Sequence, residues 1–225
     1  GGGAYPRPGE ISLSHRGVLF LDELPEFRRD CLEALRQPLE EGCIRISRAR
    51  RSITYPASFM LVCAMNPCPC GFYTDRKRLC RCGTTKIQNY KAKISGPLVD
   101  RIDIHVEVPV VKYQELSSNL AAESSEQIKI RIDKARLMQK ERLSSGEILF
   151  NAQMSHKQVR KFCCLAKVEA ELLKTAMNKL NFSARAYDKI LKVSRTIADL
   201  AECEEIKAEH LAEAVQYRSL DRSFI

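Results

Sequence analysis

The chain has 225 residues, with 37 Lys and Arg against 28 Asp and Glu, a formal net charge of +9, and a hydrophobic share of 44%. This size and composition are ordinary for a globular protein and allow one substantial domain or two small ones. The absence of any run of about 18 apolar residues argues against a membrane span. Residues 1–10 lack the features of a signal peptide, so we expect a cytoplasmic protein whose basic balance permits binding to nucleic acid.

The first 115 residues alternate between short apolar runs and helical spacing, which is the pattern of a mixed α/β domain. Two of the apolar runs are continuous, and we interpret them as buried strands of a parallel sheet. Leucines at helical spacing lie between them, in a helix that Pro38 distorts and that ends near Gly42. The expected strands lie at 10–13, 18–21, 59–65 and 102–108, with a basic-tipped hairpin at 44–55.

The rest of the chain has the periodicity of helices. Ser124 and Gln127 match a capping box at the start of the first of them. The expected helices lie at 128–138, 156–180 with a break, 183–200 and 207–218. We therefore predict two domains, a partial α/β core at 1–115 and a linker helix followed by an all-helical part at 116–225.

The strongest chemical signal is a strand that ends in two acids. The apolar residues 18–21 are followed by Asp22 and Glu23, the arrangement of a Walker B motif in P-loop ATPases. A rigid strand would hold Asp22 within reach of the Mg²⁺ on ATP, and Glu23 where it polarises the attacking water. The alternative is a strand that ends in two solvated acids, since so short a pattern recurs by chance.

Three further positions fit the same chemistry, and each has an ordinary structural alternative. Asn66 ends the second apolar run, where P-loop motors place a polar sensor of the γ-phosphate and where turns also begin. Arg101 precedes an expected strand and suits an arginine finger, or an ion pair with a flanking aspartate. Arg185 lies in the first turn of a helix capped by Ser183, which favours a bound anion or a solvated side chain.

Ten cysteines are many for a cytoplasmic protein, and four form two close pairs, Cys68 with Cys70 and Cys80 with Cys82. Four thiolates can supply a tetrahedral zinc site of structural type, in which every coordination position is filled. Clustered cysteines in a reducing compartment favour a metal over a disulfide. The pairs are tighter than the usual C-x₂-C spacing, and four unrelated thiols in a loop are the alternative.

Basic residues gather in two places. On the hairpin they are Arg45, Arg48, Arg50 and Arg51. Around the cysteine pairs they are Arg76, Lys77, Arg78, Arg81 and Lys86. Both groups suit a nucleic-acid phosphate backbone, and a solvated charged tip explains them nearly as well.

Taken together, these segments resemble the magnesium-chelatase-like AAA+ ATPases, with the competence-protein branch as the nearer match. The resemblance follows the family order over nearly the whole chain, and its segments are 8–13, 17–23, 66–71, 95–103 and 183–187. It implies an ATPase that uses ATP and Mg²⁺, assembles with copies of itself into a hexamer-like ring, and has a helical lid. It also implies that the hairpin faces the central pore.

The resemblance assigns roles to positions of this chain. It implies Asp22 and Glu23 as the Walker B acids, Asn66 as sensor 1, Arg101 as a finger acting on the neighbouring subunit, and Arg185 as sensor 2. Within it, the basic hairpin favours a motor that remodels DNA, by branch migration or a helicase-like action. Two other functions stay open: the ATPase subunit of a magnesium or cobalt chelatase, and a non-hydrolysing, zinc-stapled nucleic-acid-binding module.

One family element is missing from the sequence, the loop Gly-x-x-x-x-Gly-Lys-Ser/Thr that cradles the phosphates. In the family this loop lies upstream of the segment that matches residue 1. We therefore expect the chain to be the C-terminal part of a longer protein and to have no ATPase activity alone. Loss of the adjoining strand should leave the remaining strands mispaired or an apolar edge uncovered.

Overall fold

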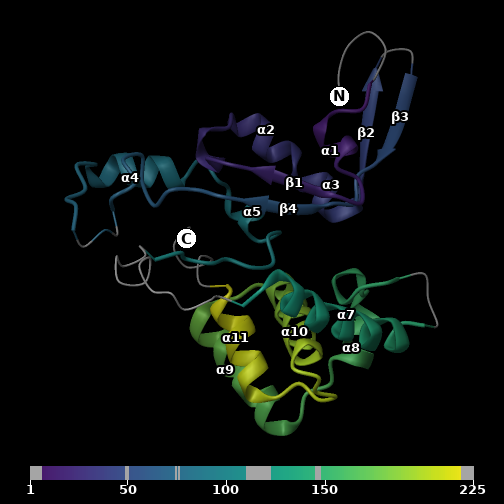
Figure 1. The fold of residues 1–225 in the computed structure, drawn as a ribbon. Coiled ribbons are helices and arrows are strands. Elements are labelled where there is room, and N and C mark those ends of the chain that lie inside the picture. The colour runs from purple at the N-terminus through teal and green to yellow at the C-terminus, as the bar shows by residue number, and fades with distance from the viewer. Residues whose placement is uncertain are drawn as a thin grey trace. The chain divides into compact units, whose positions relative to one another are not determined.

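The computed structural model describes residues 7–48, 51–73, 75, 77–109, 123–144 and 148–218. The chain divides between Ile102 and Asp103 into two compact units, an α/β unit and a helical unit. The predicted fold class, α/β followed by all-α, is confirmed at this level (Figure 1). The domain boundary predicted near residue 115 falls within 110–122, outside the described residues, and stays a prediction.

Two parallel strands, β1 (Val18–Leu21) and β4 (Met60–Cys63), form one of the two small sheets of the first unit. One face of this strand pair includes Leu19 and packs on a hydrophobic core. Leu32 of α2 and Leu98 of α5 belong to that core. On the other face, side chains such as Phe20 are exposed, at 57%. The prediction of parallel strands is confirmed. The prediction of buried strands is wrong, because described residues cover only one face.

Short helices surround this pair. Residues 10–13, predicted as a strand, form the helical turn α1 (Glu10–Leu13), because four alternating residues also fit one turn. A 3₁₀ helix (Leu24–Glu26), α2 (Arg29–Ala34) and α3 (Arg36–Glu41) follow β1. The break between α2 and α3 precedes Pro38, which lacks the N–H to continue the helix. Gly42 ends α3 at φ 64°, as the sequence predicts.

The predicted hairpin is confirmed. Its strands β2 (Cys43–Arg48) and β3 (Arg51–Pro56) pair antiparallel, with Ile46 opposite Ile53 and Arg48 opposite Arg51. The hairpin joins the amino end of β4, whereas α4 (Thr84–Lys91) lies beyond the carboxyl end, and Figure 1 shows the two at opposite ends of the unit. The short helix α5 (Gly96–Val99) completes the unit.

The last predicted strand, 102–108, is wrong. Residues 102–109 lie in neither a helix nor a strand, and Ile104, Val106 and Val108 are 49, 61 and 84% exposed. The amide of His105 donates to Tyr217 O at 2.7 Å, which is a single bond to a helix end and not a ladder. Alternating apolar residues form a strand only where another strand offers its edge, and the described residues provide none here.

Among its described residues, the second unit contains helices and connecting segments but no strand. Its helices are α7 (Ser125–Arg142), α8 (His156–Phe162), α9 (Lys167–Leu180), α10 (Ala184–Leu200) and α11 (Ala208–Gln216), with a 3₁₀ helix at Asn151–Gln153. The capping box of Ser124 and Gln127 is confirmed. Of the apolar residues whose spacing predicts α7, Ala135 is buried, but Ile128 and Ile132 are exposed. None of the described helices is both long and apolar enough to cross a membrane.

The core of this unit surrounds α10 and contains Leu143, Met154, Val159, Cys163, Leu173, Ile190, Leu191, Ala198, Ile206, Leu211 and Ala214. A charged cluster lies beside it. Asp199 is fully buried and accepts hydrogen bonds from Arg142 Nη1 at 2.9 Å, Arg195 Nε at 3.0 Å and Asn151 Nδ2 at 2.8 Å. Burial lowers the pKa of Arg195, and the adjacent Asp199 opposes that shift.

Candidate active site and metal centre

Asp22, Glu23 and Asn66 lie at the same edge of the β1–β4 pair. The strands are parallel and in register, so both segments leave the sheet at its carboxyl edge. All three side chains are exposed. The structure therefore brings together two carboxylates and one amide, the oxygen donors that Mg²⁺ prefers and that can orient a water molecule.

The backbone around the two acids is held firmly. Ala64 N donates to Leu21 O at 2.9 Å, and Leu24 N donates to Ala64 O at 3.0 Å, so that the two acids are bracketed by cross-strand bonds. Glu23 lies in the left-handed region, at φ 50° and ψ 46°, and its amide donates to Asp22 Oδ1 at 2.8 Å. A non-glycine residue pays about 1 kcal/mol or more for this conformation, which is often found at functional sites.

Arg101 follows α5 and its side chain is 11% exposed. Its guanidinium forms an ion pair with Glu40 of α3, and Nη1 donates to Pro97 O at 2.7 Å. The sequence predicts either an arginine finger or an ion pair with a flanking aspartate at this position. The ion pair found here is instead with a carboxylate 61 residues away in the chain. Arg101 is therefore held inside its own unit.

Arg185 belongs to the helical unit. The predicted N-cap is confirmed, because Ser183 Oγ accepts from Ala186 N at 3.2 Å at the start of α10. Arg185 is exposed in the first turn of that helix. The helix start favours an anion at this position, and the sensor role of Arg185 stays a prediction.

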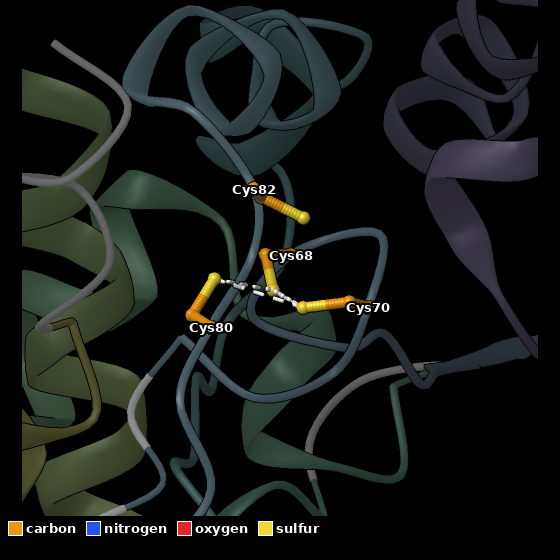
Figure 2. A group of neighbouring side chains, drawn as sticks. All are labelled: Cys68, Cys70, Cys80 and Cys82. Carbon is orange, nitrogen blue, oxygen red and sulfur yellow. Dashed lines mark hydrogen bonds between the residues drawn. The ribbon is translucent and has the colours of Figure 1, made fainter.

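The four paired cysteines converge on one point (Figure 2). Their Sγ atoms all lie within 4.8 Å of one another, and Cys68 Sγ is 3.4 Å from Cys70 Sγ and 3.7 Å from Cys80 Sγ. Zinc–sulfur bonds of about 2.3 Å place the corners of a tetrahedron about 3.8 Å apart. All four are free thiols. Donor type and spacing therefore fit a tetrahedral Zn²⁺ site.

The cluster also contains a thiol that ionises readily. A backbone N–H of Phe72 hydrogen-bonds to Cys70 and, with help from the other thiols, lowers the pKa of Cys70 to about 6. Burial and then the neighbouring Cys70 raise the pKa of Cys82. One sulfur thus offers a thiolate at neutral pH, and a bound cation would displace the remaining protons.

The basic residues of the hairpin are described in part. Arg45 is exposed on β2, and Arg48 and Arg51 face each other in the register beside the hairpin tip. Arg50 lies outside the described residues. Around the cysteines, the exposed basic residues are Lys77, Arg78, Arg81 and Lys86, and Arg76 lies outside the described residues.

Three features of these sites escaped sequence analysis. No local pattern connects Glu40 with Arg101, or Tyr90 with Asn66, whose backbone N–H lowers the pKa of the Tyr90 hydroxyl against the larger effect of burial, because each pair is distant in sequence. The buried pair of Arg195 and Asp199 had a readable signal, an i, i+4 spacing of opposite charges on one helix.

The sequence is similar to proteins of one known family over nearly its whole length. The family model described as magnesium chelatase, subunit ChlI, matches residues 1–116, and the model of the ChlI C-terminal part matches residues 122–218. Competence protein ComM of Haemophilus influenzae is 48% identical over 223 residues, which are 99% of this chain and 43% of that protein.

Two other relatives extend the comparison. The uncharacterized protein YifB of Escherichia coli is 46% identical over 226 residues, 100% of this chain and 44% of its own length. An uncharacterized protein of Mycobacterium tuberculosis is 36% identical over 218 residues, 97% of this chain and 43% of its own. The chain thus spans less than half the length of the curated relatives it matches.

Proposed function

The chain belongs to the magnesium chelatase ChlI family, and from this we propose that it is part of an AAA+ ATPase that couples ATP hydrolysis to the remodelling of DNA. The observation that carries the proposal is the parallel pairing of β1 with β4, which presents Asp22, Glu23 and Asn66 at one edge. Two acids and an amide at the carboxyl ends of parallel strands are where α/β proteins bind nucleotides.

Each of these side chains has a role in the proposal. Asp22 would hold Mg²⁺, which when bound neutralises charge on the phosphates. Glu23 orients and polarises the attacking water, and its fixed backbone limits the directions its carboxylate can take. Asn66 donates from its amide to the γ-phosphate or the water, and Arg185, in the helical unit, has the proposed role of sensor 2.

The phosphate grip comes from elsewhere in the proposed ATPase. The 225 residues contain no Gly-x-x-x-x-Gly-Lys-Ser/Thr loop. Backbone amides and the lysine of such a loop supply most of the affinity for a nucleotide. The ATPase function is thus proposed for a longer protein, of which this chain supplies the carboxylates and the lid.

The proposed ring depends on Arg101. A finger that stabilises the charge of a neighbour's transition state requires a second subunit, and a closed ring provides one at every site. The structure adds a condition, because Arg101 is held by Glu40 and Pro97. Its ion pair with Glu40 must open before the guanidinium reaches a neighbour.

DNA is the favoured substrate because of the hairpin. Arg45, Arg48 and Arg51 belong to one narrow antiparallel element at the end of the unit remote from the carboxylates. The family description also supports a second function, the ATPase subunit of a magnesium chelatase, and a cobalt chelatase is the variant of this function that the sequence leaves open. In a third, the acids are vestigial and the chain is a non-hydrolysing, zinc-stapled nucleic-acid-binding module.

An ATPase assay on the full-length protein separates the three. We expect branched DNA to stimulate hydrolysis, and we expect no change when a metal-free tetrapyrrole is added together with the metal ion to be inserted. Stimulation by the tetrapyrrole and metal ion, but not by DNA, would favour the chelatase. DNA binding without hydrolysis would favour the third function.

Zinc is the second ion that this chain's residues fit. Four thiols within 4.8 Å of one another have the donor type of a structural Zn²⁺ site. Protein purified without added metal should contain close to one zinc per chain by elemental analysis. A disulfide in the cluster, or a well-ordered loop without metal, would contradict this assignment.

A further inference from the structure

The loop that carries the cysteines begins at the candidate site. Asn66 is followed by Pro67, which restricts Asn66 to extended conformations, and then by the ligand Cys68. Gly71 lies back against this asparagine. It adopts φ 80°, and a Cβ built on it would lie 4.0 Å from Asn66 Oδ1. The loop that carries the first cysteine pair therefore folds back against one side of the exposed side chain proposed to sense the γ-phosphate.

The second cysteine pair connects to Asn66 through α4. This helix starts directly after Cys82, with Gly83 as its N-cap. Near its end, Tyr90 is only 5% exposed, and burial raises the pKa of its hydroxyl while the nearby backbone N–H of Asn66 lowers it. The Tyr90 hydroxyl therefore lies near the backbone of Asn66, so that both the cysteine loop and α4 approach this residue.

Little besides the cysteines holds this loop together. Among the described residues from 64 to 83, Cys68 is the single one whose side chain is buried. The backbone bonds within the loop are short-range, such as Gly71 N to Cys68 O at 2.9 Å. A segment without an apolar core needs a metal or disulfides to adopt one structure. These four cysteines are free thiols that fit a metal.

We propose that Zn²⁺ held by Cys68, Cys70, Cys80 and Cys82 positions Asn66 at the carboxyl end of β4. The inference rests on the proposed ATPase function and assigns the metal a role in turnover as well as in loop stability. ATP binds through groups elsewhere in the protein, so loss of zinc lowers kcat and leaves KM nearly unchanged. Small displacements of a positioned group lower rates tenfold or more.

The test uses the full-length protein and the double substitution Cys80→Ser with Cys82→Ser. Zinc content should fall, hydrogen exchange of residues 64–72 should accelerate, and kcat should fall tenfold or more with KM for ATP within about twofold. Cys82→His, which offers a nitrogen ligand in place of sulfur, should retain zinc and most of kcat. Cys31→Ser and Cys164→Ser, at exposed cysteines outside the cluster, should change none of these quantities.

A double-mutant comparison separates positioning from general damage. If zinc acts through Asn66, adding Asn66→Ala to the cysteine substitutions lowers kcat no further than Asn66→Ala alone. If the substituted protein does not fold, zinc can be removed from the wild-type protein with a chelator, and hydrogen exchange and kcat are then measured in the same way. Zinc loss with unchanged exchange and kcat overturns the inference, as does a metal-free wild-type protein.

The proposed function can fail separately. A wild-type protein without ATPase activity ends the ATPase proposal, and hydrogen exchange at 64–72 then still decides whether zinc orders this segment. A cysteine variant that loses DNA binding but keeps kcat assigns the loop to nucleic-acid contact and overturns the positioning role.

Discussion

The two units of this chain differ in how completely they bury their apolar side chains. In the helical unit, Ile190 and Leu211 are 0% exposed within one continuous core. In the α/β unit, the β1–β4 pair has one packed face, while on the other Val18 is 58% and Met60 62% exposed. An apolar face of this kind is typical of an interface with further protein. The helical unit therefore has the core of an independently folding domain, and the α/β unit has a site built on a half-covered sheet.

The largest effect is expected where the helical unit buries charge. Asp199→Ala should lower the free energy of unfolding of this unit by about 3–5 kcal/mol, since Arg142 and Arg195 would lose their shared carboxylate. Chemical denaturation, with hydrogen exchange of α10, measures the loss. Asp188→Ala is the control, because it removes an exposed pair with His156 and should cost at most about 1 kcal/mol. Equal losses would show that the network contributes no more than a surface pair.

The next effect concerns the strand tip of the α/β unit. Glu23→Gln in the full-length protein should leave ATP binding nearly intact and lower kcat on the order of 10²-fold or more, because the water loses its base. Glu26→Gln, a few residues along in an exposed pair with Lys93, is the matched control and should retain kcat. Wild-type turnover in the Glu23 variant would remove this residue from the mechanism.

How much of this could be predicted from the sequence differs between the units. Helix starts were predictable, because capping depends on neighbours such as Ser124 and Gln127 that are three residues apart. Apolar runs predicted β1 and β4 as parallel strands, though not their pairing with each other, and close spacing predicted the gathering of the cysteines. The sequence pattern failed at 10–13, where four alternating residues also fit one helical turn, and at 102–108, where the described part of the chain offers no strand edge to pair with.

The rest depended on contacts between distant residues. Sequence alone does not indicate that Arg101 meets Glu40 or that Tyr90 lies near the backbone of Asn66, because these pairs form only once α3, α4 and α5 have packed. Nor does it indicate which face of a strand is covered. Val18–Leu21 is apolar throughout, and its exposure depends on the neighbouring elements rather than on the strand itself.

The open face of the sheet allows a comparison within one strand. Leu19→Ala should destabilise the chain by about 2 kcal/mol, because Leu19 packs on the core of α2 and α5. Phe20→Ser, on the opposite face, should change stability by no more than about 0.5 kcal/mol and should reduce self-association. Unfolding curves and light scattering measure the two quantities. A larger loss for Phe20→Ser would mean that this face is covered in solution.

The smallest effect distinguishes ATP from single-stranded DNA, the two ligands proposed for the α/β unit. This chain should show no measurable ATPase activity and only weak ATP affinity, because Asp22 alone holds Mg²⁺ poorly when no phosphate-binding loop completes the coordination. Binding of single-stranded DNA does not depend on that loop and should persist, weakening as salt rises. Arg45→Ala, at an exposed hairpin position, should reduce the slope of log K against log salt by about one. Micromolar ATP affinity, or a slope unchanged by Arg45→Ala, would show that the nucleotide site or the DNA contact is misplaced.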